Sequence, residues 1–272
     1  MTTLILSTCD PVVRARARRT GLALTALLAL ASATYAQSTT GSATTTFRAV
    51  GNEPGWTLDI GGGRISLVAD YGATRADAPL PAATTLEAGK RLVARTTDGR
   101  ALEVTLVDVV CADTMTGMPR PVTVEVVLDG RTLKGCGGDP GSLLRGKTWV
   151  VEDISGRAVV DRARVTLVFG QGGRVSGTAP CNQFRATYVL SGEGLGITMP
   201  ISGMRDCPPA QTAQEGVFLE VLRGVQRFEM TRDGALVLHA ADGGRLTARA
   251  EDPVQAALEQ EAAKQKKKNK KQ

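Results

Sequence analysis

Short runs in which apolar and polar residues alternate recur along most of the chain. Leu102, Val104 and Leu106, for example, are separated by the polar residues Glu103 and Thr105, so one side of this run is more apolar than the other. A period of two residues is typical of a β-strand, whose successive side chains point to opposite faces. The alternation therefore predicts many short strands.

Pairs of residues that favour tight turns stand between several of these runs. Asp98-Gly99, Asp129-Gly130 and Asp233-Gly234 each separate two runs. Asp-Gly suits a two-residue hairpin turn, because both positions need a positive φ. Strands joined by hairpins are antiparallel, which favours curved sheets or small barrels over a parallel α/β sheet. The predicted fold class is mainly β, with two small antiparallel β domains.

The two domains are predicted at 47–138 and 142–250, on either side of the linker-like Asp139-Pro140-Gly141-Ser142. In the first domain we expect a loop at 75–88 and strands at 56–60, 64–71, 91–97, 100–110, 122–128 and 131–133. In the second domain we expect strands at 147–153, 164–169, 174–176, 186–190, 196–199, 227–231, 236–240 and 245–248. Residues 37–46 are predicted to be a flexible lead-in.

One segment, 210–222, has the spacing of an amphipathic helix. Its apolar residues predict a single buried stripe: Ala210, Ala213, Val217, Phe218, Val221 and Leu222. Pro208-Pro209 ends the preceding strands, and Gly224 is a suitable C-terminal stop. The second domain is therefore expected to carry one packed helix.

The first 36 residues have a different composition from the rest. Four arginines between Arg14 and Arg19 precede an apolar run at 21–33, and small residues follow up to Ala36. This order is typical of a secretory signal peptide, so we predict cleavage near Ala36 and export to the periplasm or cell envelope. An uncleaved membrane anchor is the alternative, although the run is short for a membrane span.

The net charge of +6 belongs to the two ends of the chain. Residues 1–36 carry a net +3, and six lysines within 264–272 close the lysine-rich tail at 251–272, which leaves −3 for the remainder. A nucleic-acid-binding domain places cations on a folded face, so the charge argues against a nucleic-acid partner. The tail is predicted to be solvated, with a weak contact to an anionic envelope surface as the alternative.

Four cysteines remain once Cys9 is removed with the signal peptide. Cys111 and Cys136 lie in the first domain, and Cys181 and Cys207 lie in the second. An oxidising compartment favours disulfides, and of the three possible connectivities the one within each domain is the simplest. A zinc site would need CxxC spacings, and a reactive thiol would need a free cysteine beside a base. We therefore expect two structural disulfides.

Candidate catalytic residues are few. His239 is the only histidine, it lies on a predicted strand, and no Gly-x-Ser-x-Gly elbow accompanies it. Glu53, Asp108 and Asp113 could form a pair of catalytic carboxylates near Trp56, although acids at strand ends commonly form caps or surface pairs. We predict that the protein is not an enzyme, with no catalytic residue, metal or cofactor.

Glycines also mark a possible phosphate-binding loop. Gly61-Gly62-Gly63 follows a predicted strand, but another strand comes after it. A phosphate cradle needs the N-terminus of a helix at that position, so we interpret these glycines as a turn.

An ordered set of residues from about 143 to 250 is more specific than any of its members: Trp149, Gly177, Asn182, Phe184, Tyr188, Met204, Glu215 and Phe218. Together with Cys181 and Cys207, this set resembles the META domain, the HslJ-like family of bacterial envelope and heat-shock proteins. Ser202-Gly203 stands where a Thr commonly precedes the Met element. The resemblance implies a curved sheet or partial barrel with one packed helix, a role in envelope or stress tolerance, and no established reaction.

Three stretches of the first domain resemble an uncharacterised bacterial envelope module that accompanies META domains: Gly51-Asn-Glu-Pro-Gly-Trp56, Cys111-Ala-Asp-Thr-Met115 and Gly135-Cys-Gly-Gly138. The likeness makes Cys111 and Cys136 family features. Many relatives are lipoproteins, but no cysteine follows the apolar run here, so a lipid anchor is not expected.

Three functions compete at this point. The first is a non-enzymatic envelope protein that binds a protein partner or an apolar ligand under stress. The second is a periplasmic inhibitor of a secreted hydrolase such as lysozyme, and the third is a carboxylate-dependent enzyme. Phe184 and Tyr188 are expected in the core, and Asn182 is expected to bond the backbone of a turn, with a binding role as its alternative.

Overall fold

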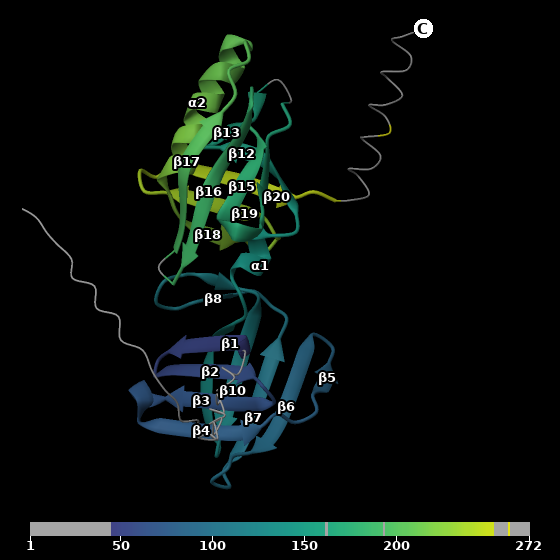
Figure 1. Cartoon of the computed structure of the whole chain (residues 1–272), viewed down its shortest axis with the longest axis vertical. Helices are drawn as coiled ribbons and strands as arrows, with labels where there is room; N and C mark the ends of the chain where they lie inside the picture. The colour runs from purple at the N-terminus through teal and green to yellow at the C-terminus, as the bar shows by residue number, and fades with distance from the viewer. Residues whose placement is uncertain (1–44, 161–162, 193, 253–260, 262–272) are drawn as a thin grey trace, which may run out of the picture. The chain divides into compact units, whose positions relative to one another are not determined.

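The computed structural model describes residues 45–160, 163–192, 194–252 and 261. They form two large antiparallel β-sheets, one from residues 45–137 and the other from residues 148–250, which we call the first and the second sheet (Figure 1). The predicted signal peptide at 1–36 and the lysines at 264–272 lie outside the described residues. The predicted mainly β fold class is confirmed.

Most strands of the first sheet pair with a strand that is next to them in the chain. The pairing of β1 with β11 joins the first and the last strand of this sheet. Its order is β4 (Thr74–Pro79), β3 (Arg64–Ala69), β2 (Gly55–Gly61), β1 (Thr45–Asn52), β11 (Arg131–Gly137), β10 (Val122–Leu128), β7 (Ala101–Val107), β6 (Gly89–Arg95) and β5 (Thr84–Leu86). The sheet curls into a half-barrel, and the N–H of Thr97, in the β6–β7 turn, donates to Asp77 O of β4 at 2.8 Å. The short helix η1 (Asp70–Gly72) and the pair β8 (Cys111–Ala112) and β9 (Pro119–Arg120) complete this part.

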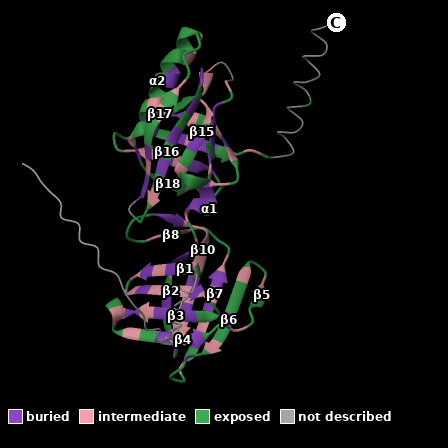
Figure 2. Ribbon diagram, in the orientation of Figure 1, coloured by how far each residue is buried: buried purple, intermediate pink, exposed green. Residues whose placement is uncertain are grey.

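One face of the first sheet is buried along nearly every strand, as the alternating colours in Figure 2 show. Its core contains Leu58, Ile65, Val104 and Val126, all of them inaccessible to solvent. Each buried aliphatic side chain of this kind contributes roughly 1.5–3 kcal/mol. The core is mainly aliphatic, with Trp56 as its buried aromatic residue among those that the structure describes.

The prediction of a loop at 75–88 is wrong. It contains most of β4 and all of β5, and Ala76 and Ala78 of β4 are fully buried. Alanine has a low β propensity, so its alternation with Arg75 and Asp77 is a weak signal in the sequence. The lead-in also ends earlier than expected, because β1 begins at Thr45.

The second sheet has the order β17 (Gly194–Ser202), β16 (Gln183–Ser191), β15 (Arg174–Thr178), β14 (Thr166–Phe169), β12 (Thr148–Ile154), β20 (Arg245–Ala250), β19 (Leu236–Ala240) and β18 (Val225–Met230). The strands β17 and β18 contact each other, so the sheet is a nearly closed barrel. The short strand β13 (Arg157–Ala158) pairs with β12, and η3 (Gln171–Gly173) precedes β15. The helix α2 (Pro209–Gly224) packs against β17 and β19 (Figure 1).

Most of the aromatic residues of the second domain lie in the core of the second sheet. Trp149 is fully buried and its indole N–H donates to Leu144 O at 2.9 Å. Phe169 and Tyr188 meet edge to face with ring centroids 5.3 Å apart, as do Phe184 and Phe218. The expected core positions of Phe184 and Tyr188 are confirmed, and edge-to-face pairs add to the energy of burial.

The predicted linker at 139–142 is partly helical. Residues Gly141–Leu144 form one turn, α1, whose Leu143 and Leu144 are buried. Only Asp139 and Pro140 stay outside it, and Asp139 Oδ1 accepts from Gly141 N at 2.9 Å where the turn begins. The break in apolar alternation at this point therefore marks a short helix and not only a connection.

The predicted helix is confirmed, but only half of the apolar residues predicted to be buried are in fact buried. Phe218, Val221 and Leu222 are buried as expected, together with the polar Gln214 and Glu215. Ala210, Ala213 and Val217 are exposed instead. The helix is thus rotated so that two polar side chains enter the interior and three apolar ones do not.

None of the helices within the described residues has the length and apolar composition needed to cross a membrane. Among those same residues, no cluster of histidine, cysteine, aspartate or glutamate side chains has the arrangement of a metal site.

Candidate functional site

The β1–β2 turn positions the first wall of the candidate site. Asn52 and Gly55 are paired at its base, and the Glu53–Pro54 peptide between them is cis. The indole of Trp56 is buried, and its N–H donates to Lys134 O at 3.2 Å. The turn is therefore fastened to β11 by a tryptophan that the sequence singled out.

Two glycines make room for this indole. A Cβ on Gly51 would lie 2.1 Å from the Trp56 indole nitrogen, and a Cβ on Gly135 would lie 2.1 Å from Val50 O and 2.7 Å from the indole ring. No side chain fits at either position unless its neighbours shift. The spacing of Gly51, Trp56 and Gly135 in the sequence thus reflects a single packing contact.

We expect Gly135→Ala to lower the free energy of unfolding by about 1–3 kcal/mol, because the added methyl overlaps the Val50 carbonyl. Urea unfolding followed by tryptophan fluorescence measures this loss. Gly196→Ala is the control, because a Cβ there meets no atom within 4 Å. Equal stability of the two variants would contradict the packing argument.

A disulfide-anchored loop forms the second wall. Cys111 and Cys136 are bonded with their Cα atoms 5.4 Å apart, as expected. Asp113 caps the turn that follows: its Oδ1 accepts from Met115 N at 2.9 Å and from Thr116 N at 2.8 Å. These contacts hold Met115 in the solvent, with 77% of the residue exposed.

Asn52 links the two walls. Its Nδ2 donates to Asp113 Oδ2 at 3.2 Å and to Thr114 Oγ1 at 3.0 Å. Burial alone would raise the pKa of Asp113, but hydrogen bonds from Thr116, Asn52 and Met115 outweigh it and lower that pKa. Asp113 is therefore a charged capping residue, and this use accounts for its place in the motif.

Tyr71 supplies the third wall, and sequence reasoning missed it. Asp70 and Tyr71 have φ values of 54° and 55°, in the left-handed region that non-glycine residues rarely occupy. Asp70 is held there by Arg131, at 2.6 and 2.7 Å, and by Thr74 at 2.7 Å. These hydrogen bonds from Arg131 and Thr74 lower the pKa of Asp70 to about 2.

The held turn projects the Tyr71 ring into solvent, with 89% of the residue exposed. The ring lies over Gly55, where an added Cβ would be 3.1 Å from it. The only signal in the sequence is the Asp-Tyr-Gly at the end of a strand-like run, and the strand predicted at 64–71 includes Tyr71 although β3 ends at Ala69. A large aromatic ring that a fixed turn holds in the open is a feature of binding surfaces.

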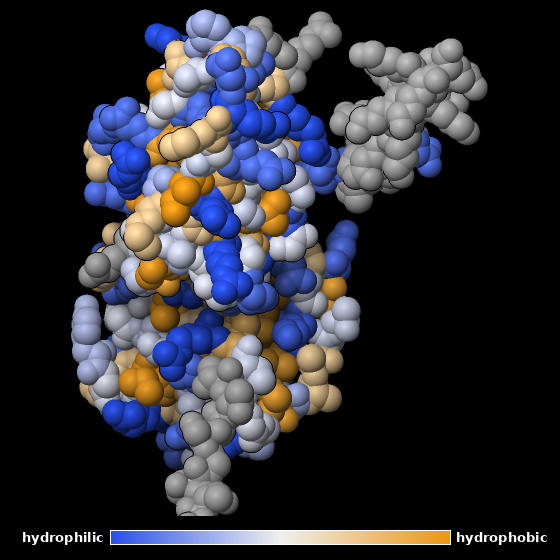
Figure 3. All heavy atoms as spheres, turned by 45° about the horizontal axis from the view of Figure 1, so that its top comes forward, coloured by the Kyte–Doolittle hydropathy of each residue, from blue (hydrophilic) through white to orange (hydrophobic). Residues whose placement is uncertain are grey.

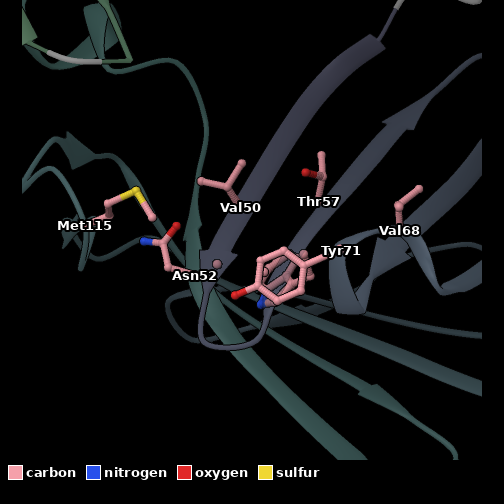
Figure 4. A pocket seen from close by; sticks show the side chains of 10 residues that line it. Val50, Asn52, Thr57, Val68, Tyr71 and Met115 are labelled. Atoms are coloured by element: carbon pink, nitrogen blue, oxygen red, sulfur yellow. The ribbon is translucent and has the colours of Figure 1, made fainter.

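The three walls border a shallow depression of about 490 Å³ on the outer face of the first sheet (Figure 4). Its floor is a row of cross-strand neighbours, Val50, Thr57 and Val68, from β1, β2 and β3. Tyr71 and Met115 stand at its rim. We call these residues, with Asn52 and Trp56, the Tyr71 depression.

A second hollow of about 310 Å³ shares Val50, Gly51 and Asn52 with the Tyr71 depression. It is lined by residues of the other two motif stretches, Cys111–Thr114 and Gly135-Cys136. All three stretches that the sequence picked out in the first domain therefore meet here, although 84 residues of sequence separate Gly51 from Gly135.

The other two acids predicted as possible catalytic carboxylates do not take part in these contacts. Glu53 and Asp108 are exposed, and no hydrogen bond joins either of them to Asp113 among the described residues. His239 lies on β19, 3.3 Å from Glu229 of the paired strand β18. Partial burial and the nearby Arg227 lower the pKa of His239, so it is mostly neutral at pH 7. What the depression offers is mainly apolar surface, with the Asn52 amide and the hydroxyl groups of Thr57 and Tyr71.

The motif residues of the second domain form a separate, buried cluster. Glu215 of α2 reaches the Cys181-Asn182 turn and accepts from Cys181 N at 2.9 Å and Asn182 N at 2.7 Å. Its other oxygen accepts from Asn182 Nδ2 at 3.0 Å. Burial acts to raise the pKa of Glu215, but these hydrogen bonds outweigh it, so the pKa is lowered and the carboxylate stays charged.

Asn182 extends this cluster to the segment before the helix. Its Oδ1 accepts from Arg205 N at 2.9 Å, and the disulfide between Cys181 and Cys207 joins the same two segments. The predicted pairing is confirmed, and so is the backbone-bonding role of Asn182. We call Asn182, Glu215 and Arg205 the Asn182–Glu215 cluster.

The remaining motif positions have different surroundings. A Cβ on Gly177 would lie 1.9 Å from Thr166 O, so this strand pair also needs a glycine. Met204 is fully exposed, so it contributes no core packing. The motif therefore combines structural positions with one side chain that faces solvent.

Comparison with known proteins identifies one of the two domains. Residues 142–253 match the family model of the META domain. An NMR structure of a protein from Burkholderia xenovorans is 23% identical, with a TM-score of 0.35 over 40% of this chain and 85% of that one. A crystal structure of a DUF4847 family protein from Bacteroides vulgatus is 14% identical, with a TM-score of 0.31 over 42% of this chain and all of that one. No curated protein matches the chain. Residues 142–253 of this protein are a META domain.

Proposed function

We propose that this protein is a non-enzymatic accessory protein of the cell envelope, exported through its N-terminal segment, which binds a protein partner through the Tyr71 depression. The observation that carries the proposal is the convergence of three separate motif stretches on two adjoining hollows, the larger of which has the exposed Tyr71 at its rim. The two disulfides support export, because such bonds persist in oxidising compartments. The META domain supports a role in stress tolerance.

A protein partner suits the depression better than a small apolar ligand. The hollow is wide and shallow, and Tyr71 and Met115 are exposed at its rim rather than enclosing its contents. Small ligands are commonly bound in deep sites that cover most of their surface. Tyrosine and methionine are enriched at protein interfaces, and a few such residues carry most of the binding energy.

We expect Tyr71→Ser to weaken partner binding by roughly 30-fold, the effect of losing an interface residue worth about 2 kcal/mol. Immobilised oxidised protein is incubated with envelope extract from stressed and unstressed cells, and captured proteins are quantified. Met115→Ser should weaken the binding of the same captured proteins. Val189→Ser removes an exposed apolar residue of the second sheet and serves as the control. The proposal fails if all three variants capture the same proteins equally.

One observation favours the second candidate, inhibition of a secreted hydrolase. The loop that carries Met115 is exposed yet fixed by the Cys111–Cys136 bond and by the Asp113 cap. A rigid, preformed loop suits insertion into an enzyme cleft, because little freedom is lost on binding. Lysozyme activity measured with the unchanged protein and with Met115→Ser tests this candidate. It requires that the unchanged protein inhibits lysozyme and that Met115→Ser does not.

A further inference from the structure

We propose that the groove between α2 and the β12–β13 hairpin binds an amphiphile with one alkyl chain and a carboxylate head group, such as a long-chain fatty acid. This site lies in the META domain and does not depend on the Tyr71 depression. Its volume is about 500 Å³, within the range of small-molecule sites.

The groove is lined mainly by small apolar side chains. Ala210, Ala213 and Val217 of α2 face Ile154, Ala158 and Val160 of the hairpin and the segment after it. The three helix residues are the half of the predicted stripe that the barrel core does not bury. Small side chains on the helix leave a channel open there, and an alkyl chain would cover the apolar surface that remains exposed.

Both sides of the groove are fixed. Ser155 and Gly156 have φ values of 51° and 84°, which folds β13 back onto β12 in a tight hairpin. Gln214 then holds the hairpin segment to the helix: its Oε1 accepts from Val160 N and its Nε2 donates to Ala158 O, each at 2.9 Å. The groove is therefore preformed, so a ligand would not have to open it.

The charge at the groove indicates the head group. Arg157 is the one charged side chain among the described residues that line it. It is exposed and, in the part of the chain that the structure describes, its guanidinium has no ion pair or hydrogen bond. A cation beside an apolar channel complements a ligand with an apolar chain and an anionic end. This complementarity favours a carboxylate over a neutral or cationic amphiphile.

Isothermal titration of the oxidised protein with dodecanoate, below its micelle concentration, tests the proposal. We expect saturable binding at one site, weakened at least about tenfold by Ala213→Trp, which fills the channel. Arg157→Glu should weaken dodecanoate by about tenfold, since it replaces attraction with repulsion, and should change dodecanol binding by less than about twofold. Tyr71→Ser is the matched control and should leave dodecanoate binding unchanged.

Thermal unfolding establishes that each variant is folded, and Val217→Glu replaces Ala213→Trp if the latter is not. The absence of saturable binding, or full binding by the channel variants, would overturn the proposal. Loss of binding in Tyr71→Ser would also overturn it, by moving the ligand to the other domain. Equal affinity for dodecanoate and dodecanol would overturn the assignment of a carboxylate head group.

Discussion

Glu215→Ala is expected to lower the free energy of unfolding by about 3 kcal/mol or more. The substitution removes the acceptor for two backbone N–H groups and one amide, all in a buried turn. Each buried donor left without a partner costs roughly 1–3 kcal/mol. Urea unfolding of the oxidised protein measures the loss.

Glu220→Ala is the matched control, because Glu220 lies on the same helix but is exposed. A surface change of this kind should stay within about 0.5 kcal/mol. If Glu215→Ala is no more destabilising than Glu220→Ala, Glu215 does not hold the Cys181-Asn182 turn.

The same carboxylate gives a pH dependence whose sign is fixed by the direction of its pKa shift. The pKa of Glu215 in the folded protein lies below its ordinary value of 4.5. The unfolded state therefore binds the proton more readily, so this contribution is present above pH 4.5 and is lost as the pH falls through the folded pKa. Glu215→Gln should make stability less dependent on pH in this acid range. An unchanged acid limb in Glu215→Gln would show that other carboxylates account for it.

Removal of either disulfide is expected to cost about 3–4 kcal/mol on the chain-entropy model. The two bonds close loops of similar length, with sequence separations of 25 and 26, so their entropic contributions should be nearly equal. Double cysteine-to-alanine variants of each pair, compared by urea unfolding, measure both losses. These costs are large against a total stability of about 5–15 kcal/mol for a typical domain.

Loss of the two disulfides should affect partner binding differently, although it should lower stability by similar amounts. Cys111–Cys136 anchors the loop that holds Met115 at the Tyr71 depression, whereas Cys181–Cys207 supports the Asn182–Glu215 cluster. Loss of the first bond should therefore reduce partner capture even under conditions where the protein stays folded. The second pair is the control for the first, and equal capture by both folded variants would argue against a role for the anchored loop in binding.

The surface gives context for the two proposed sites. On the face shown in Figure 3, hydrophobic and hydrophilic residues are interspersed. Isolated exposed apolar side chains such as Val93 are normal on folded domains. The proposed sites stand apart because their apolar residues line hollows with fixed walls, and because each has a polar group placed beside it.

The local features of this protein were readable in its sequence. Period-two alternation and Asp-Gly turns predicted the antiparallel strands, and Asp129-Gly130 forms the tight hairpin expected of it. The helix predicted at 210–222 followed from the spacing of its apolar residues and is found at 209–224, and the disulfide pairing followed from keeping each bond within one domain. The order of the motif residues along the chain indicated the META domain, which the family model matches at residues 142–253.

Only the tertiary structure decided what those elements do together. β1 pairs with β11, which brings Gly51 beside Gly135 and builds the hollow next to the Tyr71 depression from distant segments. Glu215 enters the interior because the Cys181-Asn182 turn supplies donors for it, and the helix then leaves Ala213 and Val217 outside. Hydrophobic periodicity assigns apolar residues to the core, but it contains no information about a buried donor that needs an acceptor. The exposed groove on α2 is the physical consequence of satisfying those donors.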